Sequence, residues 1–357
     1  MSASHPAGVA PPPPPPRRFH PLRWFGRLIV SLSLGVLLLI GLSLAGLTGF
    51  FSLGSDDTLH EQYHSLSRTA TDKIAVITLE GAILDGDGFV KRQIDHVRDD
   101  ESVKAVVLRV NSPGGTVNGS DYLYYHLKKM VADRKLPLVV SMGGIAASGG
   151  YYVSMAVGDE HDNVIFAEPT TWTGSIGVII PHYDVSGLME RLQISEDSIK
   201  SHRLKQMGTP TRPMTEEERE IFQGLVTDSF GRFKEIVKAG RPRFKNDDAA
   251  LDKVATGQVF TTHQALASGL VDKEGFVEDA IDRAIELAHL KKEDVRAVKY
   301  KHLGGVFDLL DIHARSRASN AGEMSAVLQF FDMATPRAYY LCTWLPALSA
   351  KSEHLGR

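Results

Sequence analysis

Short apolar runs alternate with amphipathic segments between residues 73 and 180, and this alternation constrains the fold more than any other feature of the chain. Residues 103–110 (VKAVVLRV) are a nearly continuous apolar run, which is typical of a strand in a sheet covered on both faces. The alternation predicts an α/β domain with right-handed crossovers. The expected strands are 73–79, 103–110, 137–142 and 163–167, and the expected helices are 88–99 and 117–133.

A glycine-rich turn follows the predicted strand 137–142. Residues 143–152 (GGIAASGGYY) surround Ser148 with small side chains and lead into a helix-forming run. Such a turn can present a serine at a helix start, where unpaired N–H groups favour negative charge. The serine can then attack a carbonyl, and a backbone donor can hold the resulting oxyanion. The alternative is a turn that only permits tight packing of the helix on the sheet.

A second glycine-rich turn, residues 111–115 (NSPGG), follows the predicted strand 103–110. Ligand sites in parallel sheets gather at the carboxyl ends of strands. Because both turns lie at such ends, the functional interpretation of Ser148 is favoured over the packing interpretation.

The C-terminal half is less regular. A turn followed by a strand is expected over 173–180, and residues 195–212 are irregular and carry several basic side chains. Thr215 precedes three glutamates, a pattern typical of a helix N-terminus. Thr262 is predicted to cap a helix that Gly269 ends. The remaining expected elements are helices over 184–192, 215–238 and 277–290 and a short strand and turn over 254–260.

Length and composition predict one large domain with appendages in a chain of 357 residues. The formal net charge is only -3, so no nucleic-acid partner is expected. The single cysteine, Cys342, excludes an internal disulfide and a cysteine-based metal cluster. Neither a metal site nor a cofactor is expected.

Residues 28–51 carry no charged side chain. At a rise of about 1.5 Å per residue they suffice to cross a bilayer core of roughly 30 Å, so they are predicted to be an uncleaved transmembrane anchor. A buried helix and a cleaved signal peptide are the alternatives. Arginines before the segment and acidic residues after it place residues 1–27, a disordered basic and proline-rich tail, in the cytoplasm. The rest of the chain is then expected on the extracytoplasmic, periplasmic side of the inner membrane.

After the anchor we expect a linker over 52–72, the main domain over 73–298 and a C-terminal tail over 299–357. Within the tail, residues 334–348 (ATPRAYYLCTWLPAL) are apolar and aromatic but too short to span a membrane. This segment could pack on the domain, lie at the membrane surface or dock on a neighbouring subunit, and packing on the domain is preferred.

Several motifs occur in a distinctive order: 111–115 (NSPGG), 146–152 (AASGGYY), 173–178 (TGSIGV), and Gly257 and Ala265 followed by 269–272 (GLVD). Together they resemble the signal peptide peptidase A family of membrane-anchored bacterial serine proteases, over about residues 73–290. The resemblance implies a Clp/crotonase-like α/β fold of repeated β-β-α units. It also makes residues 73–298 a peptidase domain.

The resemblance implies a serine–lysine dyad, with Ser148 as the nucleophile and Lys205 as the base. Backbone N–H groups of Gly114 and Gly149 would hold the oxyanion, and Ser175 is the candidate for orienting the lysine. A free lysine has a pKa of about 10.4 and is protonated at neutral pH. It acts as a base there only when desolvation disfavours its charged form. Lys205 is therefore expected in a mostly apolar pocket.

The chain departs from the family pattern at His202, where the family often has glycine. A Ser-His-Asp triad of the Clp type is the competing catalytic arrangement. His161 and His182 are the downstream histidines within reach in sequence, but neither lies in a motif that resembles that family's histidine. Two other functions stay open: a non-catalytic oligomeric membrane scaffold of the same fold, and a crotonase-like acyl-CoA enzyme, which the extracytoplasmic placement disfavours.

The resemblance also implies a homo-oligomer, a ring or dome of several subunits such as an octamer. In such an assembly the serine and the lysine can come from neighbouring subunits. The substrates would be remnant signal peptides and other unfolded hydrophobic peptides, bound to strand edges by main-chain hydrogen bonds. The predicted function is therefore a membrane-anchored serine endopeptidase.

Overall fold

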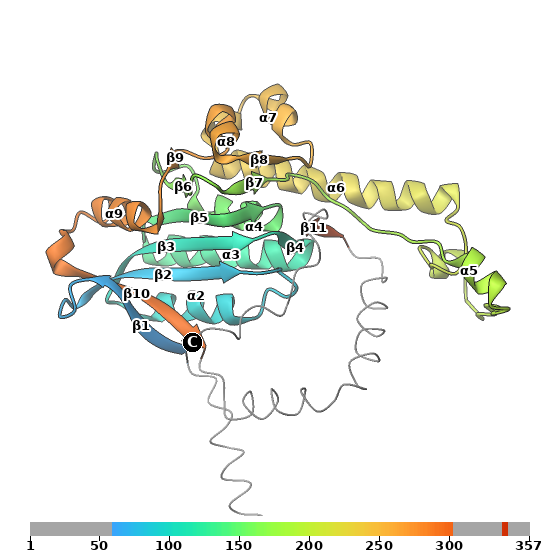
Figure 1. The fold of residues 1–357 in the computed structure, drawn as a ribbon, viewed down its shortest axis with the longest axis horizontal. Helices are drawn as coiled ribbons and strands as arrows, with labels where there is room; N and C mark the ends of the chain where they lie inside the picture. Colours follow the sequence, from blue (N-terminus) through green and yellow to red (C-terminus); the bar gives the residue numbers. More distant parts are fainter. Residues whose placement is uncertain (1–58, 303–337, 342–357) are drawn as a thin grey trace, which may run out of the picture. The chain divides into compact units, whose positions relative to one another are not determined.

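The computed structural model describes residues 59–302 and 338–341. Within these residues one sheet has nine strands, in the order β1-β10-β2-β3-β5-β6-β9, and β7 pairs with both β5 and β8 (Figure 1). The pairs from β10 through β9 are parallel, which confirms the predicted α/β class. The strands are β1 (Leu59–Leu66), β2 (Asp72–Glu80), β3 (Val103–Ser112), β5 (Leu138–Ala147), β6 (Ile165–Ala167), β7 (Trp172–Gly174), β8 (Val259–Thr261), β9 (Lys273–Glu274) and β10 (Val295–His302).

Helices cover the central strands. In β3, the run from Ala105 to Leu108 is completely buried, so both faces of this strand are covered. Helix α2 packs against β2, α9 packs against β3 and β5, and α3 packs against α2 and α4. The helices are α2 (Phe89–Asp99), α3 (Val117–Arg134), α4 (Gly149–Ser154), α5 (Ser186–Arg191), α6 (Glu216–Gly240), α7 (Asp248–Val254), α8 (Thr262–Ser268) and α9 (Val277–Leu287).

Strand β5 is longer than the sequence predicts, and it leads directly into the serine turn. Its first half pairs with β6, whereas its last residues pair with β7, where Ala147 lies opposite Gly174. The strand therefore ends one residue before Ser148, and β7 is the neighbour of that end.

Two details of the expected pattern are wrong. The segment 177–180 is not a regular strand, because Gly174 and Ser175 both have positive φ (81° and 51°) and Ile179 forms only an isolated bridge, with Tyr339. The N-cap of α8 is Thr261 rather than Thr262, since the Thr261 side chain accepts a hydrogen bond from the Gln264 N–H. Gly269 ends α8 in the left-handed conformation, as predicted.

Two strands at one edge of the sheet, β1 and β10, were not predicted from the sequence. Strand β1 lies within residues 52–72, the segment expected to be a linker, and pairs with β10 in antiparallel orientation. Strand β10 runs past the expected domain end at residue 298 and pairs with β2 in parallel orientation. Both have polar residues at many positions, which weakens the apolar pattern that identifies inner strands.

Residues 182–212, here called the arm, extend away from the sheet between β7 and α6 (Figure 1). They contain α5, in which no residue is buried, and a short 3₁₀ helix, Arg203–Gln206. Helix α6 starts with the predicted capping box, formed by Thr215 and Glu218. The Arg203–Glu217 and Arg212–Glu218 ion pairs connect the arm to this helix start.

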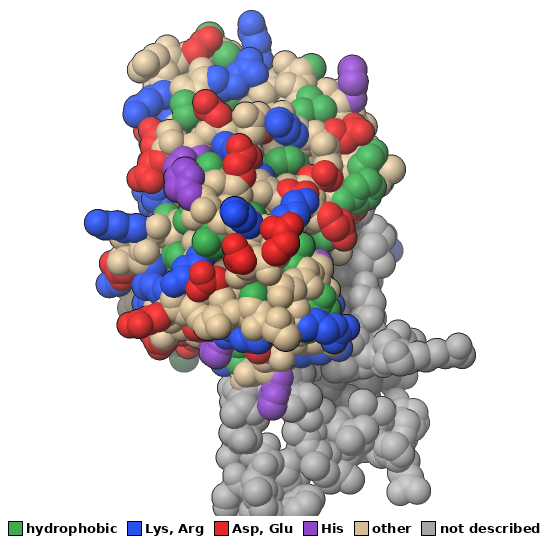
Figure 2. Space-filling model, turned by 90° about the vertical axis from the view of Figure 1, so that its left-hand side faces the viewer, with side chains coloured by type: hydrophobic (Ala, Val, Ile, Leu, Met, Phe, Trp, Pro, Cys, Tyr) green, Lys and Arg blue, Asp and Glu red, His purple; other side chains and the backbone are tan. Residues whose placement is uncertain are grey.

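The face of the described residues shown in Figure 2 mixes positive and negative side chains. Among the described helices, none is long and apolar enough to span a membrane. The predicted anchor over 28–51, the tail over 1–27 and Cys342 lie outside the described residues.

Candidate active site

Ser148 lies between the end of β5 and the start of α4, in a strained backbone conformation. Its φ is 54° and its ψ is -116°, a combination of backbone angles that residues other than glycine rarely adopt. Two hydrogen bonds hold the turn: the Ser148 N–H donates to the Gly174 carbonyl and the Tyr152 N–H donates to the Ser148 carbonyl, each at 2.8 Å. The sharp strand-to-helix turn predicted from residues 143–152 is therefore present.

The Ser148 hydroxyl is buried, and it has no hydrogen-bond partner among the described residues. Only 1% of the residue is exposed. A buried polar group without a partner costs free energy, on the order of 1–3 kcal/mol. Such groups are rare in folded proteins and call for a functional explanation.

Gly114 and Gly149 adjoin this serine, as the predicted oxyanion site requires. A Cβ atom placed on Gly114 would lie 2.6 Å from the Gly149 nitrogen and 3.0 Å from the Ser148 Cβ, so only glycine fits there. Gly114 also has a φ of 98°. Gly149 is the first residue of α4. The N–H groups in the first turn of a helix have no hydrogen-bond acceptor within the helix. The Gly114 N–H donates to the Ser112 hydroxyl at 3.2 Å.

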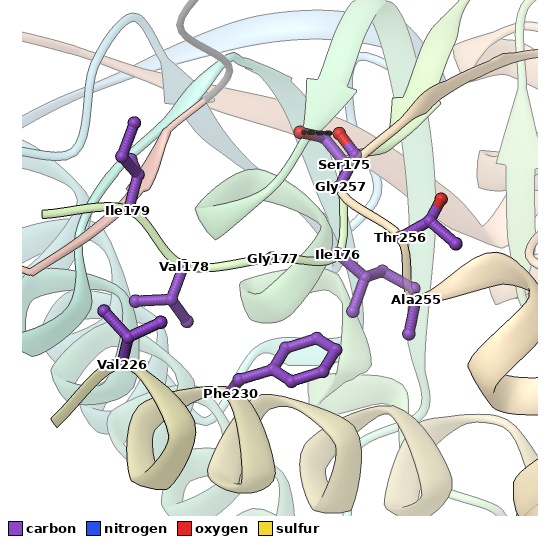
Figure 3. Close-up of a pocket in the computed structure, with 10 residues that line it drawn as sticks. All are labelled: Ser175, Ile176, Gly177, Val178, Ile179, Val226, Phe230, Ala255, Thr256 and Gly257. Carbon is purple, nitrogen blue, oxygen red and sulfur yellow. Dashed lines mark hydrogen bonds between the residues drawn. The ribbon is translucent and has the colours of Figure 1, made fainter. Parts of the chain in front are cut away.

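Ser175 directly follows β7 and borders a cavity of about 400 Å³ that is lined by both polar and apolar groups (Figure 3). Its hydroxyl donates to the Gly257 carbonyl at 3.2 Å. In Figure 3, the extended segment 176–179 forms one wall of the cavity, and Val226 and Phe230 of α6 form the opposite wall. Since the Ser148 N–H is bonded to Gly174, this cavity is close to the serine turn.

Lys205 is not placed in an apolar pocket within a single chain. It lies in the 3₁₀ helix of the arm, and its side chain is exposed. Because the Ser148 hydroxyl has no partner among the described residues, the chain by itself does not form the serine–lysine contact. Neither of the two candidate histidines is a hydrogen-bond partner of the Ser148 hydroxyl. His161 is exposed, and His182 contacts the Thr209 carbonyl at 3.3 Å.

One group of side chains among the described residues has the spacing of a metal site. Potential ligand atoms of Glu61, His96 and Asp100 lie within 4.8 Å of one another. However, the Lys73 ammonium already lies 2.6 Å from Glu61 and 2.8 Å from Asp100. Lys73 is at the start of β2, whereas Ser148 follows the end of the parallel β5, so this group is remote from the serine turn.

Residues 339–341 of the C-terminal tail pack on the domain, the placement preferred from the sequence for the segment 334–348. They form strand β11 (Tyr339–Leu341), which pairs antiparallel with β4 (Gly114–Thr116) and was not predicted as a strand. The role of the GLVD motif was not predicted either. Asp272, in the GLVD motif, accepts hydrogen bonds from the N–H groups of Val164 and Ile165 and pairs with Arg241 at 2.7 Å. The GLVD motif therefore has a structural role, which could not be predicted from its position among the other motifs.

A strained strand-to-helix turn buries a serine hydroxyl that has no partner in the part of the chain the structure describes, beside two glycines at the carboxyl end of a parallel sheet. Such a turn is typical of the nucleophile of serine hydrolases. The comparisons with known proteins agree. The model of peptidase family S49 matches residues 131–291, which include Ser148 and Lys205. The "Putative signal peptide peptidase SppA" of Enterococcus faecium is 35% identical over 73% of this chain and 75% of that protein.

Other relatives are longer than the part that matches. "Protease 4" of Salmonella typhi is 38% identical over 61% of this chain but only 35% of that protein. "Serine protease SPPA, chloroplastic" of Arabidopsis thaliana is 33% identical over 62% of this chain and 32% of that protein. The chain belongs to peptidase family S49 and is a serine-type peptidase.

Proposed function

We propose that this chain is a membrane-anchored endopeptidase that uses a Ser148–Lys205 dyad to degrade cleaved signal peptides and other unfolded hydrophobic peptides outside the cytoplasm. The observation that carries the proposal is the buried Ser148 hydroxyl, which has no partner among the described residues although it lies at a helix start beside Gly114 and Gly149. A serine nucleophile needs a base, and a base that accepts the Ser148 proton would give this buried hydroxyl its hydrogen-bond partner.

The chemistry is acyl transfer to serine. The Ser148 Oγ attacks the peptide carbonyl carbon while its proton passes to the neutral amine of Lys205. The carbonyl oxygen becomes an oxyanion, which the Gly149 N–H can hold. The Gly114 N–H can join it only after it leaves the Ser112 hydroxyl, and loss of one such donor costs about 100- to 1,000-fold in rate. The protonated amine then gives its proton to the leaving nitrogen. Water hydrolyses the resulting ester with Lys205 again acting as the base.

We infer that Lys205 reaches the serine of a neighbouring subunit. The arm that carries it exposes large apolar side chains: Tyr183, Leu188, Leu192 and Ile194 are each more than half exposed, and Ile199 is fully exposed. Five large apolar side chains exposed within 17 residues of chain favour a protein–protein interface on the arm. Burial of the arm against a second copy would remove water from the Lys205 amine, which favours the uncharged form that a base requires. The exposed arm supports a homo-oligomer, for which the family resemblance implies a ring such as an octamer.

The substrate class rests on the neighbourhood of the serine and on the relatives. The cavity beside Ser175 is walled by Ile176, Val178, Val226 and Phe230, so it would accept an apolar side chain. One relative is named a putative signal peptide peptidase. The uncharged residues 28–51 support a single-pass inner-membrane anchor with the peptidase domain on the periplasmic side. The parallel sheet supports a Clp/crotonase-like fold. The protease-named relatives disfavour a non-catalytic scaffold.

A mixing experiment tests the proposed dyad and its origin in two subunits. Ser148→Ala and Lys205→Ala are each expected to reduce cleavage of a hydrophobic reporter peptide to background. When the two purified variants are dissociated, mixed and reassociated, part of the activity is expected to return. Mixed oligomers then contain sites in which an intact Ser148 faces an intact Lys205.

Lys200→Ala is the matched control, because Lys200 is another exposed lysine of the arm. It is expected to retain the parent activity within about twofold, since surface substitutions away from a site have small effects. If Lys205→Ala is as active as the parent, the dyad is wrong. If both single variants are inactive but mixing restores nothing, the two residues belong to the same subunit.

A further inference from the structure

One of the two backbone donors at the serine turn already has an acceptor. The Gly114 N–H donates to the Ser112 hydroxyl at 3.2 Å, and this hydrogen bond is buried. The two donors are close together, since a Cβ atom on Gly114 would lie 2.6 Å from the Gly149 nitrogen. The Gly149 N–H starts α4 and has no acceptor within the helix. The Ser112 hydroxyl therefore competes with an oxyanion for one donor of the pair.

The sheet fixes the position of Ser112. The residue is completely buried at the end of β3, where it pairs with Ala146 of β5 after a shift in the register. The preceding side chain, Asn111, accepts a hydrogen bond from the Ile145 N–H at 3.2 Å. The Ser112 carbonyl oxygen lies 2.8 Å from the position that a Cβ atom on Gly150 would take, so Ser112 also packs against the first turn of α4. Only rotation about its Cα–Cβ bond can move the hydroxyl.

The peptide group that carries the Gly114 N–H can rotate while its neighbours stay fixed. It joins Pro113 to Gly114, so its rotation changes only the ψ of Pro113 and the φ of Gly114. Gly114 has a φ of 98° and no side chain, so it tolerates a wide range of φ. The next peptide group is held, because the Gly114 carbonyl accepts a hydrogen bond from the Ile83 N–H at 2.9 Å. The Gly114 N–H can therefore change its acceptor without disrupting the rest of the loop.

We propose that Ser112 is a positioning residue that holds the Gly114 N–H away from the oxyanion site until the transition state forms. The inference rests on the proposed peptidase function and deepens it at the oxyanion site. The Ser112 hydroxyl and a bound substrate carbonyl are both neutral acceptors, whereas a charged oxyanion forms a hydrogen bond roughly twice as strong. The N–H therefore changes partners as negative charge develops. An interaction gained only at that point stabilises the transition state and not the bound substrate.

Loss of the Ser112 hydroxyl is expected to make this exchange easier. In Ser112→Ala the oxyanion gains the Gly114 N–H without breaking the bond to the hydroxyl. The expected result is an increase of about 3- to 10-fold in kcat for a hydrophobic reporter peptide, which corresponds to one ordinary hydrogen bond. KM is expected to stay within about twofold, because the ground-state contacts do not change.

A pair of matched peptides tests the exchange by binding to the full chain. Acetyl-Ala-Ala-boroleucine is the oxyanion analogue: its boron bonds to the Ser148 oxygen, the Ser148 proton passes to the base, and the adduct is a tetrahedral anion. Acetyl-Ala-Ala-leucinamide is the ground-state analogue, with a neutral carbonyl at the same position. Ser112→Ala is expected to bind the boronic acid about 3- to 10-fold more tightly than the parent does, and the amide within about twofold.

Ser120→Ala is the matched control. Ser120 is also completely buried and its hydroxyl adjoins Gly149, but that hydroxyl donates to the Thr116 carbonyl at 2.9 Å instead of accepting from Gly114. This variant is expected to leave the ratio of the boronic acid and amide affinities unchanged. Ser112→Cys, whose thiol is a weak acceptor, is expected to give a ratio between those of the parent and Ser112→Ala.

The ratio of the two affinities decides the outcome. A merely structural role of Ser112 would weaken both peptides alike and leave the ratio unchanged, and an unchanged or lower ratio in Ser112→Ala would overturn the inference. If the parent binds the boronic acid but Ser112→Ala shows no change in the ratio, only the role of Ser112 is refuted. If neither the parent nor any variant binds the boronic acid, Ser148 is not the nucleophile, and the proposed function fails together with this inference.

Discussion

At the scale of single residues, Ser148 combines two unfavourable features. Its positive φ is worth on the order of 1–3 kcal/mol of backbone strain, and its buried hydroxyl lacks a partner among the described residues. Two main-chain hydrogen bonds and the close approach of Gly114 hold this conformation. The site therefore stores free energy in a group that is placed for reaction rather than for stability.

We predict that Ser148→Ala is more stable than the parent by about 1 kcal/mol, because the substitution removes a buried hydroxyl that has no partner. The matched control is Ser141→Ala in β5. Ser141 is equally buried, but its hydroxyl accepts a hydrogen bond from Arg109 at 2.8 Å. This control is expected to lose about 1 kcal/mol. Urea unfolding measures both changes, and two changes of the same sign would contradict the prediction.

At the scale of elements, the arm differs from the rest of the described chain. Helix α5 buries none of its residues, and ion pairs to the start of α6 fix the base of the arm. The Arg212 guanidinium lowers the pKa of Glu218 to about 2, with a further contribution from the Thr215 N–H, so the Arg212–Glu218 pair persists at ordinary pH. The arm is thus anchored at one end while its apolar side chains stay uncovered.

We predict that the double substitution Leu192→Ser and Ile194→Ser dissociates the oligomer and lowers peptidase activity at least about tenfold, because buried apolar anchors dominate interface energy. Sedimentation velocity measures the mass, and circular dichroism is expected to be unchanged. Tyr125→Ser is the matched control, since Tyr125 of α3 is 57% exposed but lies outside the arm. A double variant that keeps the parent mass and activity would show that the arm is not the interface.

At the scale of the whole molecule, charged groups connect the edge strands to the domain. The Lys73 ammonium of β2 bridges Glu61 of β1 and Asp100, which follows α2. Burial alone would raise the pKa of Asp100, but hydrogen bonds from Lys73 and Ser102 lower it to about 2. The pKa of an unfolded aspartate is about 3.9, so the Asp100 carboxylate binds a proton less readily in the folded state than in the unfolded state.

The charged form of Asp100 is therefore expected to stabilise the fold by about 2 kcal/mol above about pH 4, and this contribution is lost as the pH falls toward about 2. Asp100→Asn should lower the free energy of unfolding at neutral pH and flatten its dependence on pH in this range. Asp99→Asn is the control, because the Asp99 side chain is 72% exposed. Parallel pH curves for the parent and Asp100→Asn, measured by urea unfolding, would disprove the assignment.

Local patterns in the sequence were sufficient for the central sheet and for the serine turn. The continuous apolar run of β3, the small residues around Ser148 and the glycine that ends α8 each act through contacts close in sequence or through the burial of one segment. Backbone sterics and hydrophobic patterning operate at that range, so the α/β class and the sharp turn that places Ser148 at a helix start could be predicted.

Only the tertiary structure decided which distant residues meet. Asp272 fixes the start of β6, β1 and β10 complete one sheet edge, and Tyr340 lies on Tyr152, although no local pattern connects these partners. The folded chain also leaves Lys205 exposed, and Lys205 is not among any partners of the Ser148 hydroxyl, which has none within residues 59–302 and 338–341. The physical reason is that long-range contacts depend on how all the elements pack together, whereas periodicity and turn chemistry depend on neighbours along the chain.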